Sequence, residues 1–280
     1  MEYISAKLSD YEFDRISGLV YSLCGINLGS GKKELVMARL VKRLNELKLH
    51  SYDLYLEYLG KDKSGCELLQ LIDVITTNVT SFFREMHHFD YIKEQILPEY
   101  KLKFDKIRIW SAGCSSGEEP YSIAALLFEQ NGDLMPKDVK ILATDISTQA
   151  LMKAKEGVYN NQLVKSVPKT LQSKCFDAFT AEDEYGRAVN YYKVKPDIRG
   201  AVRFARLNLI DEWPMKGPFK IIFCRNVMIY FDKKTQEKLV AKYHGLLENG
   251  GHLFIGHSEN LSSISHSFKY VQPGVYLKRL

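Results

Sequence analysis

The sequence lacks the features of a membrane-spanning or disulfide-bonded protein. No apolar run approaches the roughly 20 residues that cross a bilayer, and the N-terminus has no basic segment followed by an apolar stretch. The 5 cysteines are scattered and never form a Cys-x-x-Cys pair, which argues against a disulfide framework and against a zinc knuckle. We therefore expect a cytoplasmic protein with reduced thiols and no direct membrane insertion.

Motifs for metals and for nucleotide phosphates are also missing. Of the 7 histidines only His87 and His88 are adjacent, and neighbouring helical residues point about 100° apart, so we expect no metal site. The segment from Gly29 to Lys33 is not a phosphate loop. Ile26 stands where that motif needs its first glycine, and Lys33 replaces the Ser or Thr that binds magnesium.

What is present is the composition of a globular chain with two units. The 280 residues are 45% hydrophobic and 26% charged, enough for one α/β core and a smaller second unit. From Leu8 to about Ile75 the apolar spacing is helical, with Ser9 or Asp10 as the candidate N-cap. Residues 1–75 are predicted to form an N-terminal all-helical domain.

One helix of this domain has a basic face. In the segment 32–49, Arg39, Lys42 and Arg43 lie at positions i, i+3 and i+4, apart from a stripe of leucines that we expect to be buried. This local charge indicates an acidic partner. The alternative is a solvated helix that simply carries cations.

Beyond Phe89 strands alternate with helices, which predicts an α/β domain with a doubly wound, mostly parallel sheet covered on both faces. Residues 76–98 form a connecting segment, and residues 99–280 form this second domain. The parallel pattern lapses over residues 180–204, where we expect a small antiparallel β insertion. The chain closes with an antiparallel hairpin over residues 268–278.

Polar groups follow three of the predicted strands. The first strand runs into a small-residue loop with Gly113, followed by Glu118; the second ends at Asp145, and a later one at Arg225 and Asn226. In an open doubly wound sheet, ligands bind beyond the carboxyl ends of the strands. An acidic residue that ends the second strand can accept hydrogen bonds from ribose hydroxyls, so these positions predict a nucleotide pocket.

The details of this pocket favour S-adenosylmethionine over NAD. The compact Gly-x-Gly-x-x-Gly is absent, and Asp145 lies further along the chain than the roughly 20 residues that separate the two motifs in dinucleotide folds. S-adenosylmethionine has no pyrophosphate, so a close backbone approach is enough. The acidic side chains of Glu118 and Glu119 suit its positive charges.

Several longer blocks, in the same order along the chain, resemble the chemotaxis receptor glutamate O-methyltransferases, the CheR family. The blocks are residues 76–85 (TTNVTSFFRE), 110–121, 143–146, 207–209, 223–231 (FCRNVMIYF) and 256–260 (GHSEN). The resemblance implies an S-adenosylmethionine-dependent methyltransferase fold. It also implies a set of cofactor contacts, which are Asn78, Thr80, Arg84, Gly113, Glu118, Asp145, Asn208, Leu209, Arg225 and Asn226.

The resemblance further implies that Arg84 and Tyr230 are catalytic. The implied reaction transfers a methyl group from S-adenosylmethionine to glutamate carboxylates on the cytoplasmic helices of chemoreceptors. It gives methyl esters and S-adenosylhomocysteine and serves sensory adaptation. A glutamate carboxylate, with a pKa near 4.3, is already ionised at neutral pH, so no general base is needed.

The implied partners give the basic helix a purpose. Receptor methylation regions are helical and rich in Glu, which favours docking on Arg39, Lys42 and Arg43 over a merely solvated helix. In some relatives an edge strand of the β insertion binds a receptor's C-terminal tail peptide, and residues 180–204 offer such an edge. We expect the chain to act as a monomer.

Two other functions share some of these features. A nucleic-acid methyltransferase would have the same fold, and the net charge of +5 is compatible with it. However, the chain contains no Pro-Pro, and Arg225, Asn226 and Val227 replace the Asp/Asn-Pro-Pro-aromatic motif at the strand end, so we expect no nucleic acid partner. A non-catalytic adaptor that binds S-adenosylmethionine would have no need of Arg84 and Tyr230.

Overall fold

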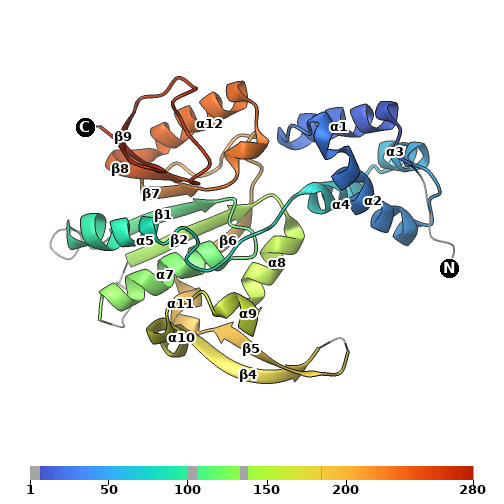
Figure 1. The fold of residues 1–280 in the computed structure, drawn as a ribbon. Coiled ribbons are helices and arrows are strands. Elements are labelled where there is room, and N and C mark those ends of the chain that lie inside the picture. Colours follow the sequence, from blue (N-terminus) through green and yellow to red (C-terminus); the bar gives the residue numbers. More distant parts are fainter. Residues whose placement is uncertain (1–6, 100–105, 133–137, 184, 280) are drawn as a thin grey trace.

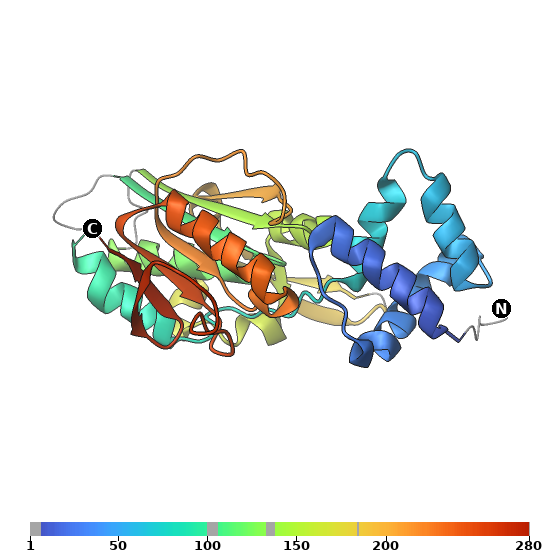
Figure 2. The same ribbon diagram turned by 90° about the horizontal axis from the view of Figure 1, so that it is seen from above.

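We describe a computed structural model of the chain over residues 7–99, 106–132, 138–183 and 185–279. Two units lie side by side, a small helical domain and a larger domain built on a central sheet (Figure 1, Figure 2). No helix in these ranges is both long and apolar enough to cross a bilayer.

The helical domain forms where the apolar spacing predicts it. It consists of α1 (Asp10–Cys24), the 3-10 helix η1 (Ser30–Lys32), α2 (Lys33–Leu47), α3 (Tyr52–Lys61) and α4 (Cys66–Ile75). A capping box starts α1, because Ser9 Oγ accepts from Glu12 N at 3.2 Å and Glu12 Oε2 accepts from Ser9 N at 2.8 Å. Phe13, Ile16 and Val20 turn into the shared core of the four α-helices.

The second domain is the predicted doubly wound sheet. Its strands, in the order β6-β2-β1-β7-β8-β10-β9, are β6 (Val202–Arg206), β2 (Asp138–Asp145), β1 (Lys106–Ala112), β7 (Phe219–Cys224), β8 (Leu247–Ile255), β10 (Val275–Lys278) and β9 (Phe268–Gln272). The pairs from β6 to β8 are parallel, and β10 pairs antiparallel with both β8 and β9. The predicted C-terminal hairpin is therefore confirmed.

Helices cover both faces of this sheet. The helices of this domain are α5 (His87–Tyr91) with the π-helical η2 (Ile92–Ile96), α7 (Glu118–Gln130), α8 (Thr148–Glu156), α9 (Asn161–Val164), α10 (Lys169–Cys175), α11 (Pro196–Gly200), the 3-10 helix η3 (Met228–Tyr230) and α12 (Lys233–Leu246). Of these, α9 and α10 pack against the small antiparallel sheet, and η3 lies beyond the carboxyl end of β7. Along β1, Ile107 and Ile109 pack in the core beneath α7, whereas Trp110 and Ala112 pack in the core beneath α12. Both faces are buried, as parallel sheets require.

The antiparallel insertion lies earlier in the chain than the sequence pattern indicates. Its strands are β3 (Val158–Asn160), β5 (Ala188–Val194) and β4 (Phe176–Glu182), and β5 is central. The residues after β5 that were expected to belong to it include β6, which pairs parallel with β2. The reason is that β3 is too short to show a period of two, and β6 is a half-exposed edge strand without a continuous apolar run.

Candidate active site

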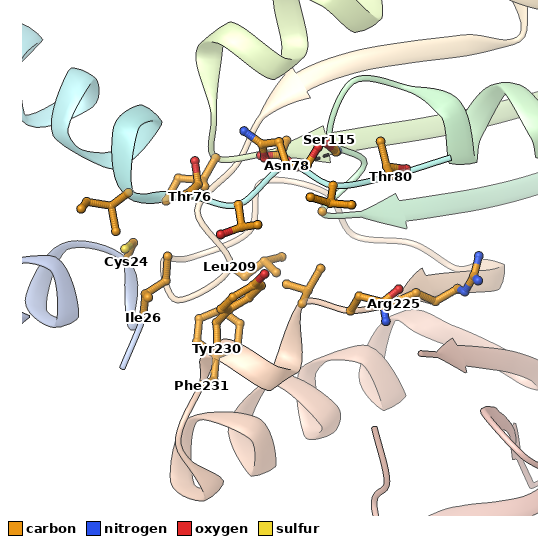
Figure 3. A pocket seen from close by; sticks show the side chains of 18 of the residues that line it. Cys24, Ile26, Thr76, Asn78, Thr80, Ser115, Leu209, Arg225, Tyr230 and Phe231 are labelled. Atoms are coloured by element: carbon orange, nitrogen blue, oxygen red, sulfur yellow. Dashed lines mark hydrogen bonds between the residues drawn. The ribbon is translucent and has the colours of Figure 1, made fainter. Parts of the chain in front are cut away.

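A cavity lies beyond the carboxyl ends of β1, β2 and β7 and extends to the helical domain (Figure 3). The connecting segment with Thr76, Asn78 and Thr80 forms one side, and Leu209 and Tyr230 lie on the other (Figure 3). The predicted site residues that line it are Asn78, Thr80, Arg84, Gly113, Asp145, Asn208, Leu209, Arg225, Asn226 and Tyr230. The strand ends named from the sequence therefore converge on one place.

The loop after β1 is packed so tightly that it needs glycine. Gly113 has φ +83°, and a Cβ on it would lie 2.3 Å from Val227 Cγ2. Its N–H and that of Cys114 both donate to Thr144 O, at 2.7 and 2.9 Å, which ties the loop to the end of β2. The backbone at this corner of the cavity is therefore fixed by its neighbours.

Asp145, the last residue of β2, presents a fixed and buried carboxylate. Its Oδ2 accepts from Ser115 N at 2.7 Å and its Oδ1 from Ser147 N at 2.9 Å. Burial raises its pKa, and the backbone hydrogen bonds oppose that effect. A carboxylate offers about four acceptor positions. These two bonds therefore hold the group in place and leave acceptor capacity facing the cavity.

The two adjacent glutamates at the start of α7 have different partners, and only the second lines the cavity. Glu118 is buried, accepts from Ser116 Oγ at 3.0 and 2.8 Å, and does not appear among the described residues that line the cavity. Glu119 does line it, and accepts from Ser111 Oγ at 2.7 Å and from Arg225 Nη1 at 3.1 Å. The structure thus places the second glutamate, which the sequence offered together with Glu118 but did not select as a cofactor contact, beside the predicted site residues.

Arg84 and Tyr230, the predicted catalytic residues, reach the same cavity from different elements. Arg84 is in the connecting segment, and its Nη1 donates to Val79 O at 3.1 Å. Tyr230 ends η3, which follows the strand end at Arg225. Its carbonyl accepts from Asn27 N of the helical domain at 2.8 Å.

The basic face of α2 is not simply three solvated cations. Arg39 donates to Ile75 O, to Thr76 O at 3.2 Å and to Thr77 Oγ1 at 2.9 Å. Arg39 therefore holds the start of the connecting segment. The expectation that its guanidinium faces a partner does not fit these bonds.

Arg43 also has partners within the domain. Its guanidinium bonds the buried Glu67 at 2.9 and 2.6 Å and Glu46 at 2.9 Å. Lys42, in contrast, is exposed on the outer face of α2. Sequence spacing placed the three cations on one face, but it could not show that two of them pair with neighbouring elements.

Two family models cover nearly the whole chain. Residues 11–76 match "CheR methyltransferase, all-alpha domain", and residues 78–277 match "CheR methyltransferase, SAM binding domain". The chain belongs to the CheR methyltransferase family. It is an S-adenosylmethionine-dependent methyltransferase, and the boundary between the two models coincides with the end of α4.

Full-length relatives agree with the family match. The chain is 39% identical to the chemotaxis protein methyltransferase of Borreliella burgdorferi over 98% of this chain and 96% of that protein. It is 40% identical to the one from Klebsiella aerogenes, over 93% and 87%. A solved methyltransferase from Methanosarcina mazei, described as SAM-dependent, shares 14% identity and covers 57% of this chain and 56% of its own, with a TM-score of 0.32.

The cavity of this CheR-family chain fits S-adenosylmethionine. The buried carboxylate of Asp145 suits ribose hydroxyls, and the apolar side chains of Ile146, Leu209 and Phe231 suit a flat base. Arg84 adds a guanidinium that can bind a carboxylate. These groups come from three separate segments, so the cofactor would bridge them.

The helical domain contributes cavity residues that the sequence did not reveal. Cys24, Ile26, Leu28 and Lys32 line the cavity, and Lys32 Nζ lies 5.2 Å from the centroid of the Tyr230 ring. Cys24 is the last residue of α1, Ile26 and Leu28 follow that helix, and Lys32 lies in η1. The sequence drew attention to this region only because residues 29–33 resemble a phosphate loop. They do not match that motif, and nothing else in the sequence pointed to a role in the cavity.

The histidine pair lies close to Glu85. Ligand atoms of Glu85, His87 and His88 are within 4.8 Å of one another. However, Glu85 Oε2 already pairs with Arg225 at 3.0 Å, and a cation bound to this carboxylate would lie close to the guanidinium charge. We assign no metal to this cluster.

Proposed function

We propose that this chain transfers the methyl group of S-adenosylmethionine to glutamate side chains on the cytoplasmic helices of chemotaxis receptors. The products would be glutamate methyl esters and S-adenosylhomocysteine. The relatives' name, chemotaxis protein methyltransferase, supports the receptor as the substrate. The observation that carries the proposal is that Arg84 and Tyr230 line one cavity with Asp145.

The chemistry requires alignment rather than a base. When bound, S-adenosylmethionine supplies a methyl group that is activated by its sulfonium charge. A glutamate carboxylate has an ordinary pKa near 4.3 and enters already ionised. Holding reactants in line can contribute on the order of 7–11 kcal/mol at best. We assign to Arg84 the binding of the carboxylate and to the Tyr230 hydroxyl its orientation.

The surroundings of Arg84 and Tyr230 favour this use. The cavity walls include apolar side chains such as Phe89, Val227 and Phe231, which exclude water from part of the site. With little water, the attraction between a guanidinium and a carboxylate strengthens, and the carboxylate loses competing solvation. Both effects help an anion to approach a cationic donor.

For the receptor helices we propose docking on the outer face of α2. Lys42 is exposed there, whereas Arg39 and Arg43 would reach a receptor only by exchanging their present partners. We also propose that the enzyme acts as a monomer in the cytoplasm. A receptor tail peptide would add to β4, which is the longer of the two edge strands of the antiparallel insertion.

One experiment tests the proposed function against its rivals. The protein is incubated with methyl-labelled S-adenosylmethionine and a receptor cytoplasmic fragment, and the product is treated with alkali. Methyl esters release volatile labelled methanol, so we expect methanol that depends on both the enzyme and the receptor fragment. Label that is fixed to nucleic acid, or no transfer at all, would contradict the proposal.

A further inference from the structure

The buried guanidinium of Arg225 contacts the backbone of Arg84. The side chain of Arg225 is 2% exposed and lies between the carboxylates of Glu85 and Glu119, at 3.0 and 3.1 Å. Its Nη2 also donates to the backbone carbonyl of Arg84 at 2.5 Å. Arg225 therefore connects the end of β7, the start of α7 and the connecting segment.

The backbone that Arg225 holds is in an unusual conformation. Phe83 and Glu85, the residues on either side of Arg84, have φ +52° and +57°. Left-handed backbone is costly for residues with a Cβ, and it persists only where surrounding contacts impose it. Phe83 N donates to Ser122 Oγ at 2.9 Å, and on the other side of Arg84 the contacts come from Arg225 and His257.

The carboxylates around Arg225 have partners of their own. Glu85 Oε1 lies 3.1 Å from His257 Nδ1, and Glu85 Oε2 accepts from His257 N at 3.2 Å. Burial alone would raise the pKa of Glu85, but the charge of Arg225 and the hydrogen bonds from Arg225 and His257 outweigh it and bring the pKa to about 2. The surroundings of Glu85 therefore favour its carboxylate form beside the Arg225 guanidinium.

This arrangement gives Arg225 a role different from the cofactor contact that the sequence indicated. Its Nη2 is occupied by Arg84 O and by Glu85, and its Nη1 bonds Glu119. Glu119 in turn is held by Ser111 at the end of β1. The contacts form a continuous chain from the rigid sheet to the backbone of Arg84.

We propose that Arg225 is a positioning residue that, with Glu85 and Glu119, fixes the backbone of Arg84 so that the Arg84 side chain meets the substrate carboxylate. The inference rests on the proposed function, because it assigns a purpose to the placement of Arg84. A lysine cannot replace this guanidinium, since one ammonium cannot reach two carboxylates and a carbonyl in the same fixed geometry.

The test compares Arg225→Lys with Arg108→Lys in the full chain. Arg108 is the matched control, because it also binds a carboxylate and a carbonyl, those of Asp138, but at the far end of β1. For Arg225→Lys we expect kcat to fall about tenfold or more, while the Kd of S-adenosylmethionine, measured by calorimetry, changes less than threefold. Arg108→Lys should leave both quantities nearly unchanged.

A double variant identifies the residue through which Arg225 acts. In the Arg84→Ala background, Arg225→Lys should reduce kcat by less than twofold further, because its target side chain is already gone. A full tenfold further loss would overturn the proposal. A tenfold weaker Kd of S-adenosylmethionine that Arg225→Lys also causes in the Arg84→Ala background would overturn it too, because it would make Arg225 a cofactor contact in its own right.

Hydrogen exchange provides a readout that does not need activity. Amides in residues 81–86 should exchange at least fivefold faster in Arg225→Lys and in the isosteric Glu119→Gln than in the wild type. Arg84→Ala, which keeps its backbone carbonyl, should not show this change. Unchanged exchange in the two network variants would refute the positioning role. If the wild type methylates no receptor but exchange still depends on Arg225, the proposed function fails and the positioning of this segment stands.

Discussion

The two walls of the cavity are built differently. The sheet wall, with Gly113 and Asp145, follows strands whose backbones pair along their whole length. The helical-domain wall, with Cys24, Ile26 and Lys32, is joined to the sheet domain by separate hydrogen bonds from loops and helix ends. These include Tyr21 Oη to Asp232 Oδ2 at 2.5 Å, Asn208 Nδ2 to Leu23 O at 2.8 Å and Asn27 N to Tyr230 O at 2.8 Å.

This difference indicates that the sheet wall is fixed by its own buried neighbours, whereas the position of the helical-domain wall depends on the contacts between the two domains. A change on the sheet wall removes a group whose position is set by buried neighbours, so its effect should be large and local. A change at the seam between the domains shifts one wall against the other, so its effect should be smaller and spread over cofactor and substrate binding. Four substitutions, in order of expected effect, test this contrast.

Tyr230→Phe, which removes a predicted catalytic hydroxyl from the sheet-domain side of the cavity, should have the largest effect. The substitution keeps the ring, its contact with Lys32 and the backbone bond from Asn27, and it removes only the hydroxyl. If the hydroxyl orients the substrate, kcat should fall about 10- to 100-fold, because misplacement of reacting groups is costly. The Kd of S-adenosylmethionine should change less than threefold.

Single-turnover methyl transfer to a receptor fragment measures the rate, and calorimetry measures the affinity. Tyr58→Phe, on the exposed surface of α3, is the control and should match the wild type. Equal turnover in Tyr230→Phe and wild type would remove Tyr230 from the catalytic assignment.

Asp145→Asn should weaken cofactor binding more than it slows methyl transfer. A hydrogen bond to a charged group contributes about 1.5–3 kcal/mol, so loss of the charge at the ribose position should raise the Kd of S-adenosylmethionine about 10- to 100-fold. Asp138→Asn is the control, since Asp138 lies at the other end of the same strand. If the two variants bind the cofactor equally well, Asp145 is not a ribose contact.

Tyr230 and Asp145 also show how much of the site the sequence could predict. Strand ends follow from apolar runs, and the parallel topology brings Asp145, Arg225 and Tyr230 together without any knowledge of side-chain contacts. Caps are equally local, and Ser147 caps α8 by accepting from Ala150 N at 3.1 Å, as its position before the helix indicates.

What the sequence could not predict depends on side-chain partners that are distant along the chain. Spacing placed Arg39 on a basic face, but its partners come from the end of α4. Glu118 and Glu119 are both acidic at the start of one helix, and only the rotation of α7 decides which one faces the cavity. Lys32 reaches the site only because the helical domain packs against η3.

Gly25→Ala should have a smaller effect, because it disturbs the contact between the helical domain and the sheet domain. Gly25 has φ +73°, and a Cβ on it would lie 2.7 Å from Ile210 Cγ2 and 3.3 Å from the Phe231 ring. Since Phe231 lines the cavity, we expect the Kd of S-adenosylmethionine to rise about three- to fivefold, equivalent to roughly 0.7–1 kcal/mol.

Gly65→Ala separates backbone strain from contact between the domains. Gly65 has a similar φ of +71°, but nothing lies within 4 Å of its added Cβ. Both variants should lose about 1 kcal/mol of stability through the left-handed backbone. Only Gly25→Ala should also weaken cofactor binding. If both variants bind the cofactor equally, the seam does not shape the cavity.

The smallest effect is expected at the outer face of α2, furthest from the chemistry. Lys42→Glu should raise the KM for the receptor fragment about two- to threefold at low salt, because an exposed charge contributes mainly to steering. The effect should fade near 0.5 M salt, where screening lengths fall to a few ångströms. Lys61→Glu on α3 is the control, since Lys61 is also exposed and charged. Arg43→Glu would test a different property: it leaves the buried Glu67 without its cationic partner and should lower the melting temperature. A salt-dependent rise in KM for Lys42→Glu, at unchanged melting temperature, would therefore separate receptor docking from the internal role of the neighbouring arginines. An unchanged KM at low salt would exclude this face of α2 as the docking surface.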